Sequence, residues 1–415
     1  MVINMSLKDG MVHLYELPEN EVCIRLPKEI QEKMFLLASK IVGNNTRLAK
    51  TLGLNKTTLL DFKKSRFAST RLRIIKALSE LLAKNGYKEY SLDNLEKKIL
   101  AIKTHWVGKF IYSPKFPINF NSKSGAITIS AILFDGGITA NKYPFYTNKK
   151  IFLIKKVLEN VRKVVGDTEF HIIKQHTGTI QLSLPKIFGL ILIHGLNIPS
   201  GKKIFTNPEI PEFILKGSKD IKKAFLQQAF DDEGSSNPGK NTSGRNIELS
   251  QSGILNNPPL RLINLKKLIS DFDIPVGGPY YISKYTAKNG RITHLWSIQI
   301  TNQRDIRRFA EEINFYLPEK RLKLKQLLDS YTLPEKFKKG ENIEVAFEAC
   351  KSLKFAGEKI IIKNVALEIG RGETHTKDIM NSLVNQGKLV VVKPKGNPTY
   401  FGEGFKPKEF DVVLK

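Results

Sequence analysis

The sequence predicts an α+β protein whose central part is an internal repeat, flanked by two smaller and mainly helical regions. Two apolar helical segments that end in an acid and a glycine, 127–137 and 224–234, open the two halves of the repeat. The same series of strand-like and helix-like segments follows each of them. Outside the repeat, short helical patterns alternate with polar breaks. The domains that we expect are 1–103, 104–218, 219–331 and 342–415.

The composition of the chain favours a polyanionic partner. The chain contains 67 Lys and Arg residues against 40 Asp and Glu residues, a formal net charge of +27, and the excess is spread along its 415 residues. A basic surface of this extent is typical of proteins that bind nucleic acid. A basic, lysine-rich proteome would give the same excess, so charge alone does not name the partner.

The cysteines and the apolar segments argue against other classes of protein. Cys23 and Cys350 lie far apart, and neither belongs to a CxxC or CxxH cluster. A disulfide framework and a structural zinc are therefore not expected, and a reducing compartment such as the cytoplasm fits. The longest apolar stretches are too short or too interrupted to span a bilayer, so no membrane partner is expected.

The first region has the helix caps and the turn residue that are typical of a helix-turn-helix. Apolar residues at helical spacing predict a helix in the segment after residue 28, and Asn45 and Thr46 can cap the next helix. Gly53 provides a tight turn, and Asn55 begins a third helix. The outward side chains of this helix could enter a major groove, although an ordinary small helical bundle is the alternative. These side chains are Lys56, Thr57, Thr58, Lys63 and Lys64.

The order of elements in the last region resembles a winged helix. Lys393 and Lys395 lie in a basic turn and could contact phosphate there. Winged helices also serve as dimerisation or protein-contact modules, which is the alternative reading. After a first helix from about residue 342, the predicted elements are a strand at 360–362, helices at 364–369 and 374–385, and strands at 389–392 and 399–401 on either side of the turn.

Each half of the central repeat combines two strand pairs with further helices. In 179–184, polar residues at odd positions alternate with apolar residues at even positions, which leaves one polar sheet face. A polar face on a curved sheet suits a DNA duplex. The predicted helices are 149–165 and 187–196 in the first half, and 259–271 and 304–315 in the second. The side chains that could reach base edges are Gln175, Gln181, Ser283, Lys284 and Gln299.

The repeat resembles the LAGLIDADG homing-endonuclease family over about half of the chain. The second half carries the stronger match, because residues 226–234, Leu-Gln-Gln-Ala-Phe-Asp-Asp-Glu-Gly, align with the nine-residue signature without a gap. The phrases Ile210-Pro-Glu-Phe-Ile and Phe315-Tyr-Leu-Pro-Glu-Lys are similar to the usual flanks. Either signature alone would be weak, but two of them at this interval, with matching elements downstream, form a specific signal.

The resemblance implies αββαββα repeats that form a DNA-binding saddle in a monomer. Its two signature helices would pack side by side on a pseudo-twofold axis, so that Asp135 and Glu233 meet beneath double-stranded DNA. Hard divalent cations such as Mg²⁺ prefer carboxylate oxygens, and metal ions at the two scissile phosphates would cut both strands, with one acid per strand. Gly136 and Gly234, beside the metal ions, are expected to leave each helix with a positive φ. Taken separately, each acid is an ordinary turn or helix-end residue.

The signature departs from the family pattern at its third and seventh positions, which are normally small because the helix backbones approach closely there. Ser130 and Phe134 occupy them in the first half, and Gln228 and Asp232 in the second. The three larger side chains predict a looser or re-spaced interface, and a small misplacement of catalytic groups reduces the rate strongly. A scaffold without activity is therefore an alternative.

A basic residue often lies near each centre in this family. Lys203 and Lys320 occupy that place, after the closing helix of each half, and are the candidate catalytic lysines. In so lysine-rich a chain, a solvated surface role is an equal alternative.

Three functions follow from these patterns. The leading hypothesis is a site-specific, Mg²⁺-dependent double-strand DNA endonuclease. A transcription regulator that keeps the scaffold as a DNA clamp without cutting is the second. An RNA maturase that binds intron RNA is the third.

Overall fold

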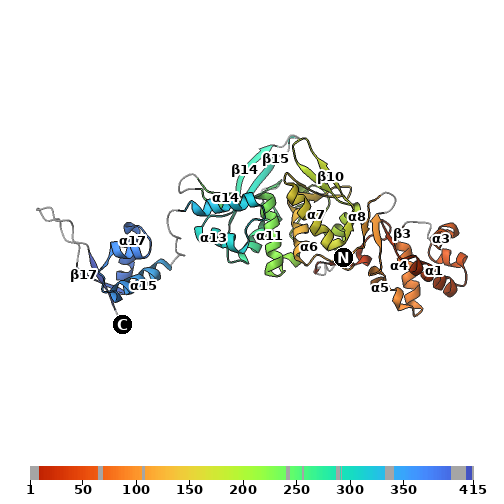
Figure 1. The fold of residues 1–415 in the computed structure, drawn as a ribbon, viewed down its shortest axis with the longest axis horizontal. Coiled ribbons are helices and arrows are strands. Elements are labelled where there is room, and N and C mark those ends of the chain that lie inside the picture. Colours follow the sequence, from red (N-terminus) through yellow and green to blue (C-terminus); the bar gives the residue numbers. More distant parts are fainter. Residues whose placement is uncertain are drawn as a thin grey trace. The chain divides into compact units, whose positions relative to one another are not determined.

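The computed structural model describes residues 9–63, 69–104, 108–239, 244–254, 257–286, 290, 292–331, 341–393 and 408–413. The protein is α+β, with helices packed on small antiparallel sheets (Figure 1). It divides into two compact units. The first consists of 1–237, 246–301 and 308–324, and the second of 238–245, 302–307 and 325–415. In the described residues, no helix has the length and apolar character needed to cross a membrane.

Three short helices follow one another near the N-terminus: α1 (Lys28–Val42), α2 (Asn45–Thr51) and α3 (Lys56–Lys63). Asn44, rather than Asn45, caps α2, because its side chain accepts a hydrogen bond from the Arg47 N–H at 2.9 Å. Asn55 caps α3 by accepting from the Thr58 N–H at 2.7 Å. Gly53 between them has a φ of +61°, which suits the predicted tight turn.

A five-stranded sheet crosses the predicted boundary at residue 103. It joins strands from the first region to strands that follow, in the order β3-β2-β4-β5-β9. These strands are β2 (Val22–Arg25), β3 (Thr70–Arg71), β4 (Ala101–Thr104), β5 (Ile111–Tyr112) and β9 (Asp167–Thr168). The same part of the chain contains α4 (Leu72–Lys84), α5 (Leu92–Glu96), and the pair β1 (Met11–Val12) and β6 (Ile118–Asn119). The first region is therefore not only helical.

The two central halves have four-stranded antiparallel sheets of the same strand order. The sheet β7-β8-β11-β10 and the sheet β12-β13-β15-β14 both pair their first, second, fourth and third strands in that order. The first half contains α6 (Lys123–Leu133), β7 (Gly136–Ile138), β8 (Pro144–Asn148), α7 (Ile151–Val165), β10 (His171–Lys174), β11 (Ile180–Ser183) and α8 (Lys186–Leu190), which a π-helix (Ile191–Gly195) continues. The second contains α11 (Lys219–Glu233), β12 (Gly234–Asn237), β13 (Asn246–Gly253), α12 (Leu260–Ser270), β14 (Gly277–Thr286), β15 (Ile292–Ile300) and α13 (Gln303–Glu312). Between and after the halves lie α9 (Lys203–Thr206), α10 (Glu212–Leu215) and α14 (Pro318–Asp329).

The inner strands of each sheet bury one face and leave the alternating, mostly polar side chains more exposed, whereas β10 and β14 also expose apolar side chains. Along β13, Ile247 and Leu249 are buried, and the alternating Glu248 and Ser250 are not. On β11, Leu182 is buried beneath α7, as the predicted alternation requires. The buried face of each sheet therefore packs on the helices that position the acids.

The second unit contains α15 (Glu341–Phe355), β16 (Ile360–Ile361), α16 (Ile362–Glu368), α17 (Glu373–Asn385), β17 (Leu389–Lys393) and β18 (Glu409–Val412) around an apolar core. Its strands pair in the order β16-β18-β17. β17 pairs with β18, and the predicted partner of β17, residues 399–401, lies outside the described residues. The predicted hairpin with 399–401 therefore stays a prediction.

Candidate active site

The site is built on two helices, α6 and α11, that pack against each other (Figure 1). Ser122 caps α6 by accepting from the Gly125 N–H, and every residue of α6 from Gly125 to Leu133 except Ile127 is buried. The Ser130 hydroxyl donates to the Phe225 carbonyl of α11 at 2.9 Å. A side chain as small as serine allows this direct bond between one helix and the backbone of the other.

Asp135 follows the end of α6 and is partly buried. Its Oδ2 atom accepts a hydrogen bond from the Asn148 amide at 2.9 Å, and Asn148 stands on β8. Burial, followed by the negative charge of Glu233, raises the pKa of Asp135 from 3.8 to about 7, against the opposing charge of Lys203. The two predicted acids therefore interact electrostatically, although Glu233, the last residue of α11, is the more exposed of the two.

The larger residues of the signature fill the helix interface. Phe134 is buried and packs edge-on against Phe225, with ring centroids 6.0 Å apart. Gln228 is fully buried and donates to Asp232 at 2.9 Å and to the Tyr146 hydroxyl at 3.2 Å. These larger side chains therefore make specific contacts within the interface between the two helices.

Both candidate lysines cap the ends of the signature helices. Lys203 donates to the carbonyls of Leu133 and Phe134 at the end of α6. Lys320 donates to the carbonyls of Phe230, Asp231 and Gly234, at 2.9, 2.6 and 2.7 Å. An ammonium group at a helix C-terminus offsets the partial negative charge there. The alternative of solvated surface lysines is therefore wrong.

Burial modifies the acidity of both lysines. It lowers the pKa of Lys203 to about 8, helped by the charge of Arg261, and it also lowers the pKa of Lys320. Asp231, the sixth residue of the signature, accepts the backbone N–H groups of Tyr316 and Leu317 at 2.9 and 3.0 Å. These bonds fix the start of α14 and, with it, the position of Lys320.

The glycines that follow the two acids do not have the positive φ that we expected. Gly234 has φ −80° and ψ 154°, and Gly136 is not among the positive-φ residues. The chain passes from each helix directly into an extended strand, so no left-handed turn is needed. Glycine is required there because of close packing, since a Cβ atom on Gly136 would lie 2.4 Å from the Phe145 carbonyl oxygen and 2.7 Å from that of Ala131.

Replacing Gly136 with alanine is expected to destabilise the protein by about 2–4 kcal/mol, because both clashing atoms belong to the backbone and cannot move aside. Gly137→Ala is the matched control, since the nearest atoms to its Cβ belong to the Phe145 ring, at 3.1 and 3.2 Å. Denaturant unfolding of the two variants measures the difference. Equal stability of Gly136→Ala and the unchanged protein would contradict this explanation.

A buried arginine near the acids had no place in the predicted site. Arg261, in the first turn of α12, is 3% exposed and donates to Gln251 of β13 at 2.7 Å. Its Nε and Nη1 atoms have no partner among the described residues. Burial lowers the pKa of Arg261 to about 10, and the charge of Glu233 opposes this shift. One guanidinium with free N–H groups therefore lies within electrostatic reach of Glu233.

The donor set at the helix ends suits a hard divalent cation. Asp135 and Glu233 offer carboxylate oxygens, and a bound cation would offset both causes that raise the pKa of Asp135, which are burial first and then the charge of Glu233. The Gly234 carbonyl already accepts from Lys320. Among the described residues, a cluster of three possible metal ligands occurs elsewhere, at His13, Asp93 and Glu96. There Glu96 is already bonded to His13 and to the Leu14 N–H, at 3.1 Å each, and ties two segments together.

The polar sheet faces carry most of the predicted base-reading residues. In the first half, Gln175 donates to Gln181 at 3.2 Å, and Gln181 donates to Ser183 at 3.0 Å, which forms a row of amide and hydroxyl groups. In the second half, Ser283 is paired with Leu295, which shares its face with Gln299 because side chains alternate along β15.

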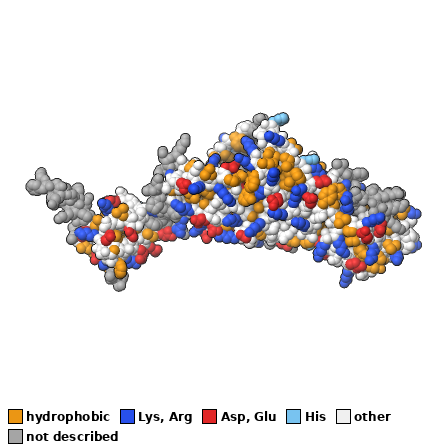
Figure 2. Space-filling model, in the orientation of Figure 1, with side chains coloured by type: hydrophobic (Ala, Val, Ile, Leu, Met, Phe, Trp, Pro, Cys, Tyr) orange, Lys and Arg blue, Asp and Glu red, His pale blue; other side chains and the backbone are white. Residues whose placement is uncertain are grey.

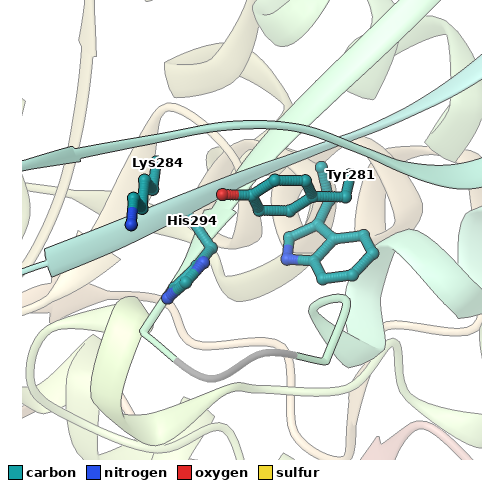
Figure 3. Close-up of a pocket in the computed structure, with 4 residues that line it drawn as sticks. Tyr281, Lys284 and His294 are labelled. Atoms are coloured by element: carbon teal, nitrogen blue, oxygen red, sulfur yellow. The ribbon is translucent and has the colours of Figure 1, made fainter.

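Lys284 does not share that face. It is paired with His294, and it lines a pocket of about 380 Å³ together with His294, Tyr281 and Trp296 (Figure 3). Along β15, His294 and Trp296 lie on the face opposite to that of Leu295 and Gln299. Lys284 and Ser283 therefore point to opposite sides of the hairpin, and base contact by either side chain stays a prediction.

The flanking candidates are described in part. Lys56 and Thr57 are exposed at the start of α3, and Thr58 is partly buried. Lys64 and Lys395 lie outside the described residues, and the side chains of Lys63 and Lys393 are likewise not described. Lys and Arg side chains are scattered over the visible face of the molecule among apolar and acidic ones (Figure 2).

No family model matches the chain, and no curated protein matches it. Solved structures of I-DmoI are similar to part of it. I-DmoI in complex with DNA and manganese shares 14% identity over 47% of this chain and 98% of that chain, with a TM-score of 0.31. I-DmoI in complex with DNA and calcium shares 13% identity over 50% and 98%, with a TM-score of 0.31. Mesophilic variants of the homing endonuclease I-DmoI share 13% over 47% and 97%, with a TM-score of 0.30.

Proposed function

We propose that this chain is a site-specific, divalent-metal-dependent double-strand DNA endonuclease of the homing type that acts as a monomer. The observation that carries the proposal is the placement of Asp135 and Glu233 at the ends of two helices that pack together, each followed at once by the first strand of its own sheet. Since the two sheets repeat one strand order, one acid belongs to each half. Each half would then act on one DNA strand.

The chain's own groups divide the chemistry between them. Asp135 and Glu233, with the carbonyl of Gly136 beside Asp135, would hold a divalent cation such as Mg²⁺, which supplies Lewis-acid activation of the phosphate and of water. Lys203 and Lys320 hold the helix ends in place and offset the partial negative charge of their carbonyls. Arg261 offers N–H donors to a phosphate oxygen.

DNA would lie on the polar faces of the two sheets. The net charge of +27 favours a duplex, and it implies binding that weakens steeply as salt rises. The predicted helix-turn-helix, with Lys56 and Thr57, and the predicted winged helix near the C-terminus would extend the contact with the DNA backbone.

A cleavage assay tests the proposal. Its substrate is a DNA duplex in which the two genomic sequences that flank the gene are joined directly, without the gene between them. With Mg²⁺, we expect one defined double-strand cut. Asp135→Asn and Glu233→Gln should each leave a nick, in opposite strands, and the double variant should bind without cutting. Strand-specific end labels on a denaturing gel measure this. Double-strand cutting that both substitutions leave intact would overturn the proposal.

A transcription regulator that binds DNA without cutting is the second candidate. The predicted helix-turn-helix and winged helix favour it, as do Phe134, Gln228 and Asp232 at positions that are normally small in the resembled family. Salt-sensitive binding to a promoter, with no nick under Mg²⁺ or Mn²⁺, would support this candidate. Tight binding of intron RNA in the same assay would instead support a maturase.

A further inference from the structure

A chain of hydrogen bonds runs from α11 in the second half to Asp135 in the first. The Tyr146 hydroxyl donates to Asp232 Oδ1 at 2.6 Å, and it lies 3.4 Å from the Asn148 amide nitrogen, which donates toward it. The same amide nitrogen donates to Asp135 Oδ2 at 2.9 Å. Asp232 is therefore linked to Asp135 through two side chains of β8.

Further contacts at Asp232 and at Asn148 fix which group donates and which accepts in each of these hydrogen bonds. Asp232 also accepts from Gln228 at 2.9 Å, and its Oδ2 atom has no partner among the described residues. Because the Tyr146 proton is engaged by Asp232, the hydroxyl oxygen keeps a lone pair for the Asn148 amide. The Asn148 Oδ1 atom accepts the Lys150 N–H at 3.0 Å, which keeps the amide nitrogen turned toward Asp135.

Among its described residues, the second half has no equivalent of this series of hydrogen bonds. Tyr146 of β8 is paired with Gly136 of β7. The equivalent residue in the second half, which is paired with Gly234 of β12, is the apolar Leu249 of β13. At the places of Asp232 and Gln228, α6 has Phe134 and Ser130, which contact Phe225. Gln251, at the place of Asn148, accepts from Arg261. The hydrogen bonds that hold Asp135 therefore have no counterpart at these positions of the second half.

We propose that Asp232 is a positioning residue for the Asp135 centre, and that it acts across the helix interface through Tyr146 and Asn148. This inference rests on the proposed endonuclease function. It assigns a role to a residue that, by its size, should disturb the interface. It also implies that the two strands depend on different supporting side chains, so that damage to this chain of bonds slows the cutting of one strand only.

Tyr146→Phe is the sharpest test, because it removes one oxygen atom and keeps the buried ring. Mn²⁺ affinity of the free protein, followed by electron paramagnetic resonance, gives a readout that does not require cutting. We expect a loss of affinity of about tenfold, with Asp135→Asn as the reference for a lost ligand. In single-turnover cleavage, the strand that Asp135→Asn leaves uncut should be cut about tenfold more slowly, and the other strand at its normal rate.

Two further variants separate positioning from packing. Asp232→Leu should reproduce the Tyr146→Phe effect, whereas Asp232→Asn keeps an acceptor for the hydroxyl and should restore most of the affinity. Ser130→Ala is the matched control, because it removes a bond between the same two helices outside this chain of bonds. It should change neither the Mn²⁺ affinity nor the ratio of the two strand rates.

The outcomes are distinguishable. If Tyr146→Phe and Ser130→Ala have equal Mn²⁺ affinities, or if Tyr146→Phe slows both strands alike, the positioning role is overturned while the endonuclease stands. If Asp135→Asn leaves the Mn²⁺ affinity unchanged, Asp135 holds no metal, and the proposed function fails together with this inference.

Discussion

Replacing Asp135 with asparagine is expected to stabilise the metal-free protein at pH 8 while it removes one strand cut. In the folded chain, burial and the charge of Glu233 raise the pKa of Asp135 from 3.8 to about 7. Above pH 7 the folded protein therefore carries an ionised carboxylate in an unfavourable place. That ionisation costs at most about 4 kcal/mol of folding free energy. Asparagine has no charge to bury, and its side-chain oxygen can accept the same hydrogen bond from Asn148.

The sign of the pH dependence follows from the direction of the shift. Between pH 4 and 7 the folded state binds more protons at Asp135 than the unfolded state does, so stability falls as the pH rises through this window. The advantage of Asp135→Asn should be complete above pH 7, shrink as the pH is lowered, and vanish near pH 4. Unfolding followed at several pH values in the presence of a chelator measures it.

Metal ions and a second variant provide the controls. Mn²⁺ should raise the melting temperature of the unchanged protein, because the cation offsets the negative charge of the Asp135 carboxylate. It should have much less effect on the Asp135→Asn variant. Glu233→Gln should give a smaller gain, since Glu233 is exposed. An Asp135→Asn variant that is less stable than the unchanged protein at pH 8, or equally altered at pH 4 and 8, would contradict the burial that we describe.

The parts of the fold that could be predicted from the sequence are those with a strong local period. The helices at α7, α12 and α17 repeat apolar residues every three or four positions, and the alternation in β11 places Leu182 inside. The five-stranded sheet was missed because β3, β5 and β9 have two residues each and carry no period. Such strands form only because their partners arrive from elsewhere in the chain.

The same distinction applies to the candidate site. Asp135 and Glu233 could be identified because an acid followed by glycine ends an apolar helix twice. Asn148 and Tyr146 reach the site through the register of β8 against β7, which no local pattern records. Arg261 did leave a signal, since it stands four residues before the buried Leu265 on the apolar side of α12. A charged residue in an apolar stripe is unusual enough to mark a functional position.

The second large effect concerns that arginine. Arg261→Met is expected to reduce cutting of the strand that depends on Glu233 by about 10²–10³-fold, which is the typical cost of removing one donor to a developing charge in an enclosed site. The reason is the free Nε and Nη1 atoms of a guanidinium that is 3% exposed and lies within reach of the Glu233 charge. Methionine keeps the apolar stem of the side chain and removes the N–H groups.

The stability of the same variant separates catalysis from folding. Burial already lowers the pKa of Arg261 to about 10, so its charge is a cost to the fold that methionine removes. The Gln251 oxygen loses its partner in exchange, and the two changes should nearly cancel in the melting temperature. Arg261→Lys keeps the charge but not the fork of donors, so we expect an intermediate rate. Single-turnover rates for each labelled strand, measured beside the melting temperature, decide the matter. A variant that melts earlier but cuts both strands at normal rates would make Arg261 a structural residue, whereas a slow strand at an unchanged melting temperature would place it in the reaction.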